Sequence, residues 1–248
     1  MTDSQESPFD DLTPIADCRF CSFQTKTLLM GRCTPGDACV LVQSGRQIDR
    51  FFRNNPQYAS RYLRDEFWER RAIAVRYSPQ SELINMIKDP DEAVRRAVAY
   101  RLPPDQLEGM IDDIDREVRI TVADRIPLDK LELLANDPDY LVRAYVAQRL
   151  PAGRLFRLIR DPDRQVRKLV AKRIPEASLG MMLYDPEPEV RRVVASRAQS
   201  DELELLLKDE DWVVRLTAAE RAPLESLEPL KNDPEPEVVR TVQERQNS

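Results

Sequence analysis

The fold is decided by residues 137–151, which read DPDYLVRAYVAQRLP. The same phrase returns every 24 residues without insertion, and an aspartate marks each start: Asp89, Asp113, Asp137, Asp161, Asp185, Asp209 and Asp233. Residues 64–88 form an earlier unit that is one residue longer. A fixed period of this length is typical of a solenoid, because each unit covers its apolar face only by stacking on its neighbours.

Each unit predicts one amphipathic α-helix followed by a short helical turn. Asp137 is expected to cap the helix, with Pro138 in the first helical position. Val142 and Val146 recur at four-residue spacing and form the buried face, and Pro151 stops the helix. The residues that remain hold a Leu-x-x-Leu step, for which a single 3₁₀ turn has room and a second α-helix has not.

All four cysteines, Cys18, Cys21, Cys33 and Cys39, lie within 22 residues, and the 209 residues that follow contain none. In a reducing compartment such a group is more often a set of metal ligands than a pair of disulfides. Four cysteines suit both a [4Fe-4S] cluster and one Zn²⁺ ion, and packing as small apolar side chains is the remaining interpretation. The spacing favours the cluster, because zinc ribbons usually place glycine after the second cysteine, where Ser22 stands here.

Two short helices are expected around these cysteines. Ser22 can cap a helix that runs to Met30, with Gly31 as its stop. Residues 34–37 resemble a capping box that opens a second helix to about Gln43. This interpretation places the last cysteine inside the second helix and the other three at or before helix starts, where peptide N–H groups stabilise negative charge.

The 24-residue Asp-Pro-Asp-x-x-Val-Arg unit, preceded by four cysteines, resembles the leucine-rich repeat variant family over about residues 18–245. The resemblance implies a right-handed superhelical solenoid of alternating α and 3₁₀ helices, with a small N-terminal helical domain that holds a [4Fe-4S] cluster. HEAT-like repeats share part of the motif but need longer units. We therefore expect an all-α chain with a disordered acidic tail (1–17), an iron-sulfur domain (18–63) and a solenoid of seven repeats plus a truncated unit (64–248).

Arginine recurs at two positions in each unit. The first row holds Arg95, Arg119, Arg143, Arg167, Arg191 and Arg215, and the second holds Arg101, Arg125, Arg149, Arg173, Arg197, Arg221 and Arg245. Pairing with the repeated aspartates of neighbouring units is the favoured interpretation, and phosphate binding along a basic row is the alternative. The aromatic residues of 51–68 are expected to form a core between the cysteine segment and the first repeat, rather than a base-stacking surface.

Composition narrows the function classes. A net charge of −6 argues against general electrostatic binding to nucleic acid or to anionic membranes. The lack of a leader or of a long apolar run predicts a cytoplasmic protein without membrane contact. Histidine is absent and no phosphate-binding glycine loop occurs, so we expect no enzyme.

The leading functional hypothesis is an iron-sulfur protein that binds a partner protein and transfers an electron or senses redox state. One alternative is a structural zinc or iron-sulfur site that caps a protein-binding scaffold. The other is nucleic-acid binding through the arginine rows.

Overall fold

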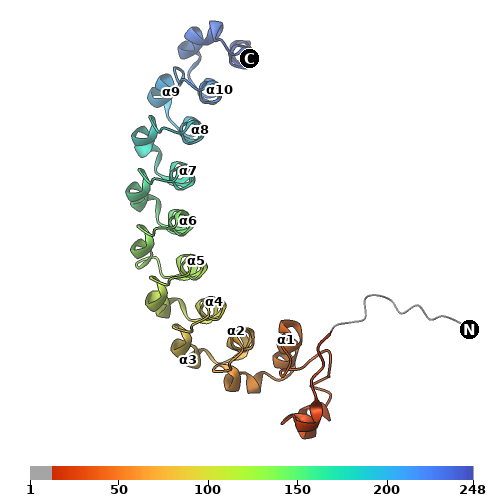
Figure 1. Ribbon diagram of the computed structural model, residues 1–248. Coiled ribbons are helices and arrows are strands. Elements are labelled where there is room, and N and C mark those ends of the chain that lie inside the picture. Colours follow the sequence, from red (N-terminus) through yellow and green to blue (C-terminus); the bar gives the residue numbers. More distant parts are fainter. Residues whose placement is uncertain (1–12, 248) are drawn as a thin grey trace, which may run out of the picture. The chain divides into compact units, whose positions relative to one another are not determined.

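The computed structural model describes residues 13–247, so the part of the predicted acidic tail before residue 13 lies outside the described residues. The chain divides into two compact units, Met1–Ile126 and Pro127–Ser248. Each unit is a stack in which α-helices alternate with 3₁₀ turns (Figure 1).

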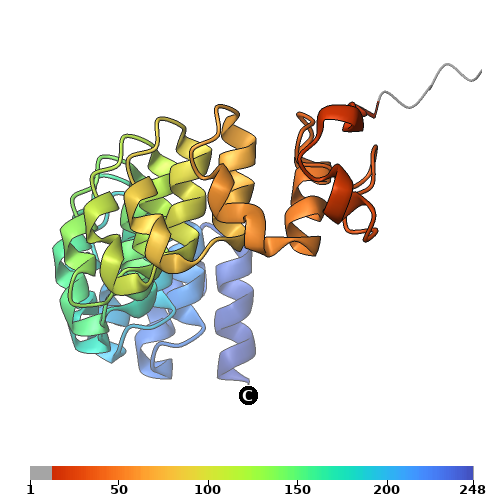
Figure 2. The same ribbon diagram turned by 90° about the horizontal axis from the view of Figure 1, so that it is seen from below.

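The N-terminal unit begins with two short turns, the 3₁₀ helix η1 (Cys18–Phe20) and the π-helix η2 (Gln24–Leu28). The remaining elements are α1 (Gly45–Asn54), η3 (Pro56–Tyr62), α2 (Trp68–Tyr77), α3 (Gln80–Leu83), η4 (Ile84–Met86), α4 (Glu92–Arg101), η5 (Pro104–Met110) and α5 (Arg116–Arg125). In this unit α1 stands between α2 and the cysteine segment, as two views at right angles agree (Figures 1 and 2).

The C-terminal unit continues the same alternation. Its elements are η6 (Leu131–Leu134), α6 (Tyr140–Arg149), η7 (Ala152–Leu158), α7 (Arg164–Arg173), η8 (Glu176–Met182), α8 (Pro188–Ala195), α9 (Ser200–Leu206), α10 (Trp212–Ala219), η9 (Leu224–Asn232) and α11 (Pro236–Gln246). The predicted solenoid of α and 3₁₀ helices is confirmed, and across residues 13–247 the only extended pairing is one isolated bridge, Thr34 with Ala38.

The α-helices begin two residues later than predicted. Asp139, not Asp137, is the N-cap of α6, and its carboxylate accepts a hydrogen bond of 2.8 Å from the Leu141 amide. Asp137 instead accepts from the Asp139 amide at 2.8 Å and is itself buried. Both aspartates can cap a helix, and the choice between them follows from what the first one binds, which is described below.

The core of each repeat lies between its α-helix and the 3₁₀ turn that follows it. Val142, Val146 and Leu150 from α6 and its end are fully buried, and so is Leu155 from the following turn. The predicted 3₁₀ turns occur in most of the 24-residue repeats, but in the repeat that starts at Asp185 the corresponding element, α9, is an α-helix. There Gln199 replaces the usual proline and forms a capping box with Glu202, which supplies the acceptor that an α-helical start needs.

Among residues 13–247, no helix combines the length and the apolar character needed to cross a bilayer.

Candidate metal centre

The four cysteines lie on two neighbouring loops of the N-terminal unit. Cys18 opens η1 and Cys21 closes it, with the Cys21 amide donating to the Cys18 carbonyl at 3.2 Å. Cys33 and Cys39 stand on either side of a tight turn that the Thr34–Ala38 bridge closes. The first two side chains are half-buried and the last two are buried.

The thiols are close enough to influence one another's ionisation. Burial, with smaller contributions from the neighbouring Cys39, Cys21 and Cys18, raises the pKa of Cys33 to about 11. Burial also raises the pKa of Cys18, with contributions from Cys21 and Cys39. These contributions place the four predicted ligands in one neighbourhood. As the side chains stand, however, no three histidine, cysteine, aspartate or glutamate groups among residues 13–247 converge on a single ion position.

The loops supply hydrogen bonds to and around the sulfur atoms. The Phe23 amide donates to Cys21 Sγ at 3.4 Å, and the Cys39 amide donates to the Gln47 carbonyl of α1 at 3.1 Å. An N–H donor stabilises a thiolate over a thiol, because it places positive charge beside the sulfur. Four thiolates around a [4Fe-4S]²⁺ core leave a net charge near −2, which such donors help to hold.

The prediction of a second helix over residues 34–43 was wrong. Gly36 has φ +78° and the chain turns back on itself, so the Ala38 amide donates to the Thr34 carbonyl at 2.8 Å. The helix starts instead at Gly45, where a side chain would collide with the carboxylate of Glu69 on α2. The helix expected from Ser22 exists only as the short η2. Cys39 therefore lies on a loop rather than inside a helix.

An aromatic cluster fixes the loops to α1. Phe23 lies 5.0 Å from both Phe51 and Tyr58, measured between ring centroids, and Phe52 lies 5.4 Å from Tyr62. Phe51 and Phe52 are fully buried. The expectation that these aromatic residues form a core beneath the cysteine segment is confirmed, although Trp68 at the end of the group is exposed.

Two buried amides, which the sequence did not single out, tie the loops to the same helix. Asn55 Nδ2 donates to the carbonyls of Arg32 at 2.7 Å and Phe51 at 2.9 Å. Gln47 Nε2 donates to the Pro14 carbonyl at 2.8 Å. The only signal in the sequence was that Gln47 and Asn55 lie near the two ends of the amphipathic helix α1. These amides position the backbone on both sides of the cysteines.

Replacing Asn55 by alanine is expected to destabilise the N-terminal unit by about 1–3 kcal/mol, because it leaves buried carbonyl groups without a donor. Urea unfolding of the metal-loaded protein measures the change. The neighbouring Asn54 is exposed, so Asn54→Ala is the matched control and should shift the free energy of unfolding by less than about 0.5 kcal/mol. Equal losses in the two variants would contradict the positioning role.

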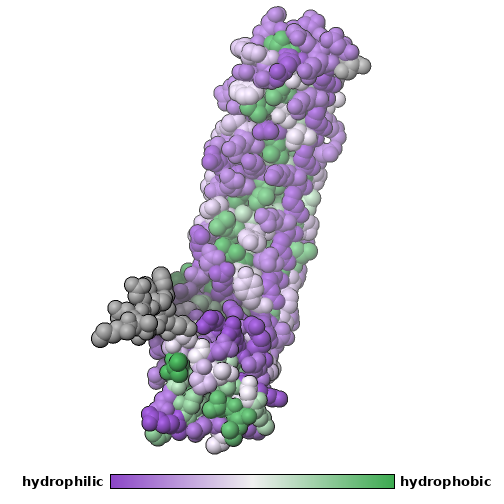
Figure 3. Space-filling model, turned by 90° about the vertical axis from the view of Figure 1, so that its right-hand side faces the viewer, coloured by the Kyte–Doolittle hydropathy of each residue, from purple (hydrophilic) through white to green (hydrophobic). Residues whose placement is uncertain are grey.

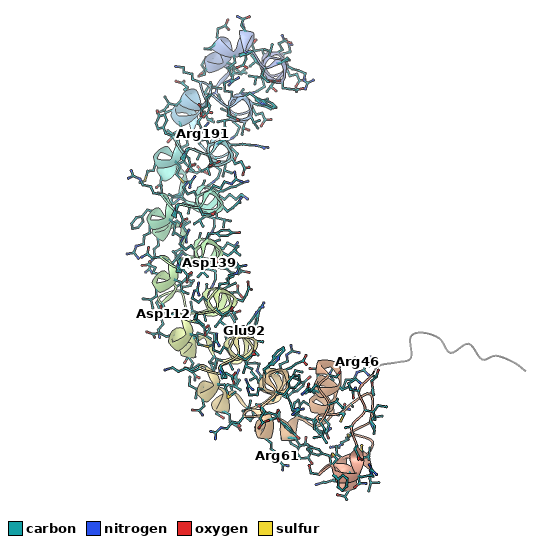
Figure 4. The ribbon with its side chains drawn as sticks, viewed as in Figure 1. Arg46, Arg61, Glu92, Asp112, Asp139 and Arg191 are labelled. Carbon is teal, nitrogen blue, oxygen red and sulfur yellow. The ribbon has the colours of Figure 1, made fainter. Side chains whose placement is uncertain are left out.

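The first arginine row is structural. Arg167 binds Asp185 of the next repeat through Nε at 2.7 Å and Nη2 at 3.0 Å, and its Nη1 donates to the Asp161 carbonyl at 2.8 Å. The same two-pronged pairing joins Arg71 to Asp89, Arg95 to Asp113, Arg143 to Asp161, Arg191 to Asp209 and Arg215 to Asp233. Arg191 lies between the α-helices and the 3₁₀ turns in Figure 4. The predicted inter-repeat pairing is confirmed for these residues.

The second arginine row binds carbonyl oxygens instead of the predicted aspartates. Arg221 Nη1 donates to the Ala195 carbonyl at 2.8 Å and to the Ala198 carbonyl at 3.1 Å, at the end of the preceding helix. Arg197 reaches the Ala171 carbonyl at 2.6 Å. The last carbonyls of a helix lack partners within it, so a guanidinium group placed there satisfies them and complements the helix dipole.

A groove of about 1000 Å³ runs over α1, α2, α4 and α5 within the N-terminal unit, and we call it the α1–α5 groove. Its walls include the exposed rings of Trp68 and Tyr100, and the Arg96 guanidinium lies 5.9 Å from the Tyr100 ring centroid. Figure 4 labels Arg46 and Glu92, which line this groove, and Arg61, which lies on the 3₁₀ side of the unit. The groove combines aromatic surface with charges of both signs.

The residues present fit an iron-sulfur cluster. Four thiol donors lie in one neighbourhood, and one of them already accepts a backbone N–H. The two carboxylates beside them, Asp17 and Asp37, are paired with Arg19 and Arg50 rather than directed at the thiols. Cys18, Cys21, Cys33 and Cys39 would hold the group, which supplies one-electron redox chemistry when bound.

Comparison with known proteins agrees with both parts of the chain. A family model described as "LRV protein FeS4 cluster" matches residues 14–61, and a model described as "Leucine rich repeat variant" matches residues 92–115, 116–139 and 140–163. A curated relative from Rhodobacter capsulatus, an uncharacterized 27.7 kDa protein in the nifB 3′ region, is 39% identical over 96 residues. That match takes in 39% of this chain and 39% of the relative.

A solved structure described as a leucine-rich repeat variant with a novel repetitive protein structural motif is 67% identical to the chain. The match covers 94% of this chain and 100% of that one, with a TM-score of 0.90. Together with the cysteine-segment model, this identifies an iron-sulfur-binding repeat protein. The chain belongs to the leucine-rich repeat variant family.

Proposed function

We propose that the chain is a cytoplasmic, non-enzymatic iron-sulfur protein that binds a partner protein and exchanges one electron with it or reports redox state to it. The observation that carries the proposal is the gathering of four thiols on two loops, where the other cysteines contribute to the raised pKa values of Cys18 and Cys33. All four cysteines are then ligands, so a [4Fe-4S] cluster would have no iron open to a substrate. Electron transfer or sensing fits that arrangement better than substrate activation.

The α1–α5 groove is the surface that we assign to the partner protein. Exposed aromatic rings such as Trp68 and Tyr100 contribute large contact areas at protein interfaces, and the surrounding charges give orientation. The groove shares α1 with the cysteine segment, whose Cys39 amide donates to the carbonyl of Gln47 in that helix. A change at the cluster therefore has a short covalent and hydrogen-bonded route to the groove.

Nucleic-acid binding through the arginine rows has less support. The first-row guanidinium groups named above are engaged by aspartates and carbonyls, and Arg143, Arg167 and Arg191 are buried. A phosphate would have to displace these partners. If the rows nevertheless bind nucleic acid, affinity for single-stranded DNA would fall steeply as salt rises.

Anaerobic purification followed by iron, sulfide and zinc analysis tests the cofactor. We expect a coloured protein with acid-labile sulfide that gains an electron paramagnetic resonance signal on one-electron reduction. A colourless protein that holds zinc and no sulfide would instead support the structural-metal alternative. A cluster that cannot be reduced, and whose removal unfolds residues 18–63 without weakening partner binding, would make it purely structural.

Capture from native cell extract, with the double variant Trp68→Ala and Tyr100→Ala as the comparison, tests the groove. We expect the variant to keep its iron and to lose the captured partner. Tyr184→Ala, which removes a still more exposed ring from the C-terminal unit, is the control. Equal capture by the groove variant and the control would reject the groove as the binding surface.

A further inference from the structure

The cysteine segment leaves several large apolar side chains in solvent. The exposed fraction is 72% for Ile15, 89% for Phe20, 80% for Leu29, 62% for Met30 and 43% for Leu41. A single exposed apolar side chain is ordinary, but a group of them in one short stretch marks an interaction surface. We call these five residues the cysteine-loop face.

The residues of this face lie around the thiols. Phe20 stands between Cys18 and Cys21 in η1, and η1 contacts η2, which leads directly into Leu29 and Met30. Ile15 packs over the turn between the other two cysteines, since its Cγ1 lies 3.7 Å from where a Cβ of Gly36 would be. Figure 3 shows apolar side chains gathered at its lower end, where this segment lies, with hydrophilic groups between and beside them.

The stretch that carries the face is weakly basic. Residues 15–41 contain Arg19, Lys26 and Arg32 together with Asp17 and Asp37, a local charge of +1 in a chain whose net charge is −6. Asp17 pairs with Arg19 and Asp37 pairs with Arg50 of α1, so Lys26 and Arg32 give the exposed face its basic character. The side chains of Lys26 and Arg32 are exposed, and Arg19 is held beside Phe20 by Asp17 at 2.6 Å. Aromatic residues, methionine and arginine are the types enriched at the centre of protein interfaces.

The described part of the chain does not cover this face. The inner side of the segment is already filled, because Phe23 packs on Phe51 and Tyr58, whereas Phe20 and Leu29 point away from that core into solvent. Two exposed basic side chains, Lys26 and Arg32, beside an apolar centre favour a partner with acidic side chains around its own apolar centre and speed its approach through electrostatic attraction. Small, weak interfaces of this kind are typical of redox encounters.

We propose that the cysteine-loop face is the docking site for a small acidic electron-carrier protein. The inference rests on the proposed redox function and adds to it the class of the carrier and the surface that receives it. Cys18, Cys21, Cys33 and Cys39 would hold the cluster, which would accept the one electron that the reduced carrier gives up, with no bond made or broken. The α1–α5 groove remains available to a second protein, because none of its lining residues belongs to the cysteine-loop face.

The test uses the cluster-loaded chain with an acidic plant-type ferredoxin as the probe. Stopped-flow absorbance follows electron transfer from the reduced ferredoxin, and calorimetric titration with the oxidised ferredoxin measures binding when no electron moves. The triple variant Phe20→Ser, Leu29→Ser, Met30→Ser should lose about tenfold or more in both rate and affinity. The double variant Lys26→Glu, Arg32→Glu should lose rate most strongly at low salt.

Matched serine substitutions of exposed apolar residues in the repeats, Ile114→Ser and Tyr184→Ser, serve as controls and should change neither readout. Iron analysis confirms that each variant carries its cluster. If the triple variant fails to bind its cluster, the test rests on the Lys26→Glu, Arg32→Glu variant and on the salt dependence measured with the unchanged chain. An electron-transfer rate that does not depend on salt overturns the proposal.

Reduction by dithionite separates this proposal from the proposed function. A chain that neither dithionite nor ferredoxin reduces refutes the redox function itself. A chain that dithionite reduces but ferredoxin neither binds nor reduces overturns only the docking face. Self-association that the triple variant abolishes would assign the face to a second copy of the chain, which also overturns the proposal.

Discussion

Replacing Cys33 by serine is expected to lower the iron and acid-labile sulfide of the purified protein to about a tenth or less of the parent content, which for a [4Fe-4S] cluster is about four of each per chain. Serine offers a hard, protonated oxygen where the cluster needs a soft thiolate. Cys33 is buried and its ionisation is coupled to all three other cysteines, so its loss removes the central member of the ligand set. Anaerobic purification with iron and sulfide analysis provides the measurement.

Ser22→Ala is the matched control, because Ser22 is exposed and directly follows Cys21, a proposed ligand on the neighbouring loop. It should retain the full iron content. Hydrogen exchange adds a structural readout: amides of residues 18–44 should exchange faster in Cys33→Ser, while those of α4 and α5 keep their protection. A Cys33→Ser protein with undiminished iron and sulfide would show that the cluster has other ligands.

The repeats were largely predictable because their chemistry is local and repeated. Val142 and Val146 share one helix face whatever surrounds them, and Pro151 stops the helix by its covalent structure. The short space before the next aspartate excluded a second long helix, and a 3₁₀ turn such as η7 is what fits. These outcomes depend on sequence spacing alone.

The helix start was misplaced because a tertiary contact decides it. Asp161 and Asp163 are both good capping residues, and local propensity cannot rank them. The guanidinium group of Arg143, from the preceding repeat, binds both carboxylate oxygens of Asp161, at 2.7 and 2.9 Å. That pairing draws Asp161 out of the capping role and leaves Asp163 to cap α7. The sequence predicted the ion pair but not its consequence for the helix boundary.

The sequence predicted that the four cysteines gather in one neighbourhood, but not the backbone that carries them. The cysteine spacing is visible in the chain, but the capping-box resemblance at residues 34–37 was misleading. Gly36 adopts a left-handed conformation that ends the run before a helical turn can form. Asn55 and Gln47 went unnoticed because a buried amide has no sequence pattern and acquires its role only from the carbonyls that fold against it.

The Arg215–Asp233 pair also makes stability depend on pH. Hydrogen bonding to Arg215 holds the pKa of Asp233 below its ordinary value. A carboxyl whose pKa is lower in the folded state stabilises the fold above its unfolded pKa, near 4, and loses that contribution as the pH falls through the folded value. The repeats should therefore keep this contribution at neutral pH and weaken under acidic conditions.

Replacing Arg167 by methionine is expected to destabilise the C-terminal unit by about 3–5 kcal/mol, because the change leaves the buried carboxylate of Asp185 without its counter-charge. The change also removes the hydrogen bonds that Arg167 Nη1 donates to the carbonyls of Asp161 and Pro162, at 2.8 and 3.2 Å. Solenoids can unfold in parts, so urea unfolding should be paired with hydrogen exchange across α7 and α8. Arg192→Met, at an exposed position of the next repeat, is the control and should change the free energy of unfolding by less than about 0.5 kcal/mol.

A double-mutant cycle separates the contribution of the Arg167–Asp185 ion pair to stability from the cost of leaving the Asp185 carboxylate buried without a counter-charge. Asp185→Leu in the Arg167→Met background removes the stranded carboxylate, so the double variant should recover a large part of the loss even though both charges are gone. The terminal repeat already carries an apolar residue in this row, since Val239 stands where the other units have arginine. A double variant as unstable as Arg167→Met alone would mean that the guanidinium's bonds to the two carbonyls, rather than its pairing with Asp185, hold the repeats together.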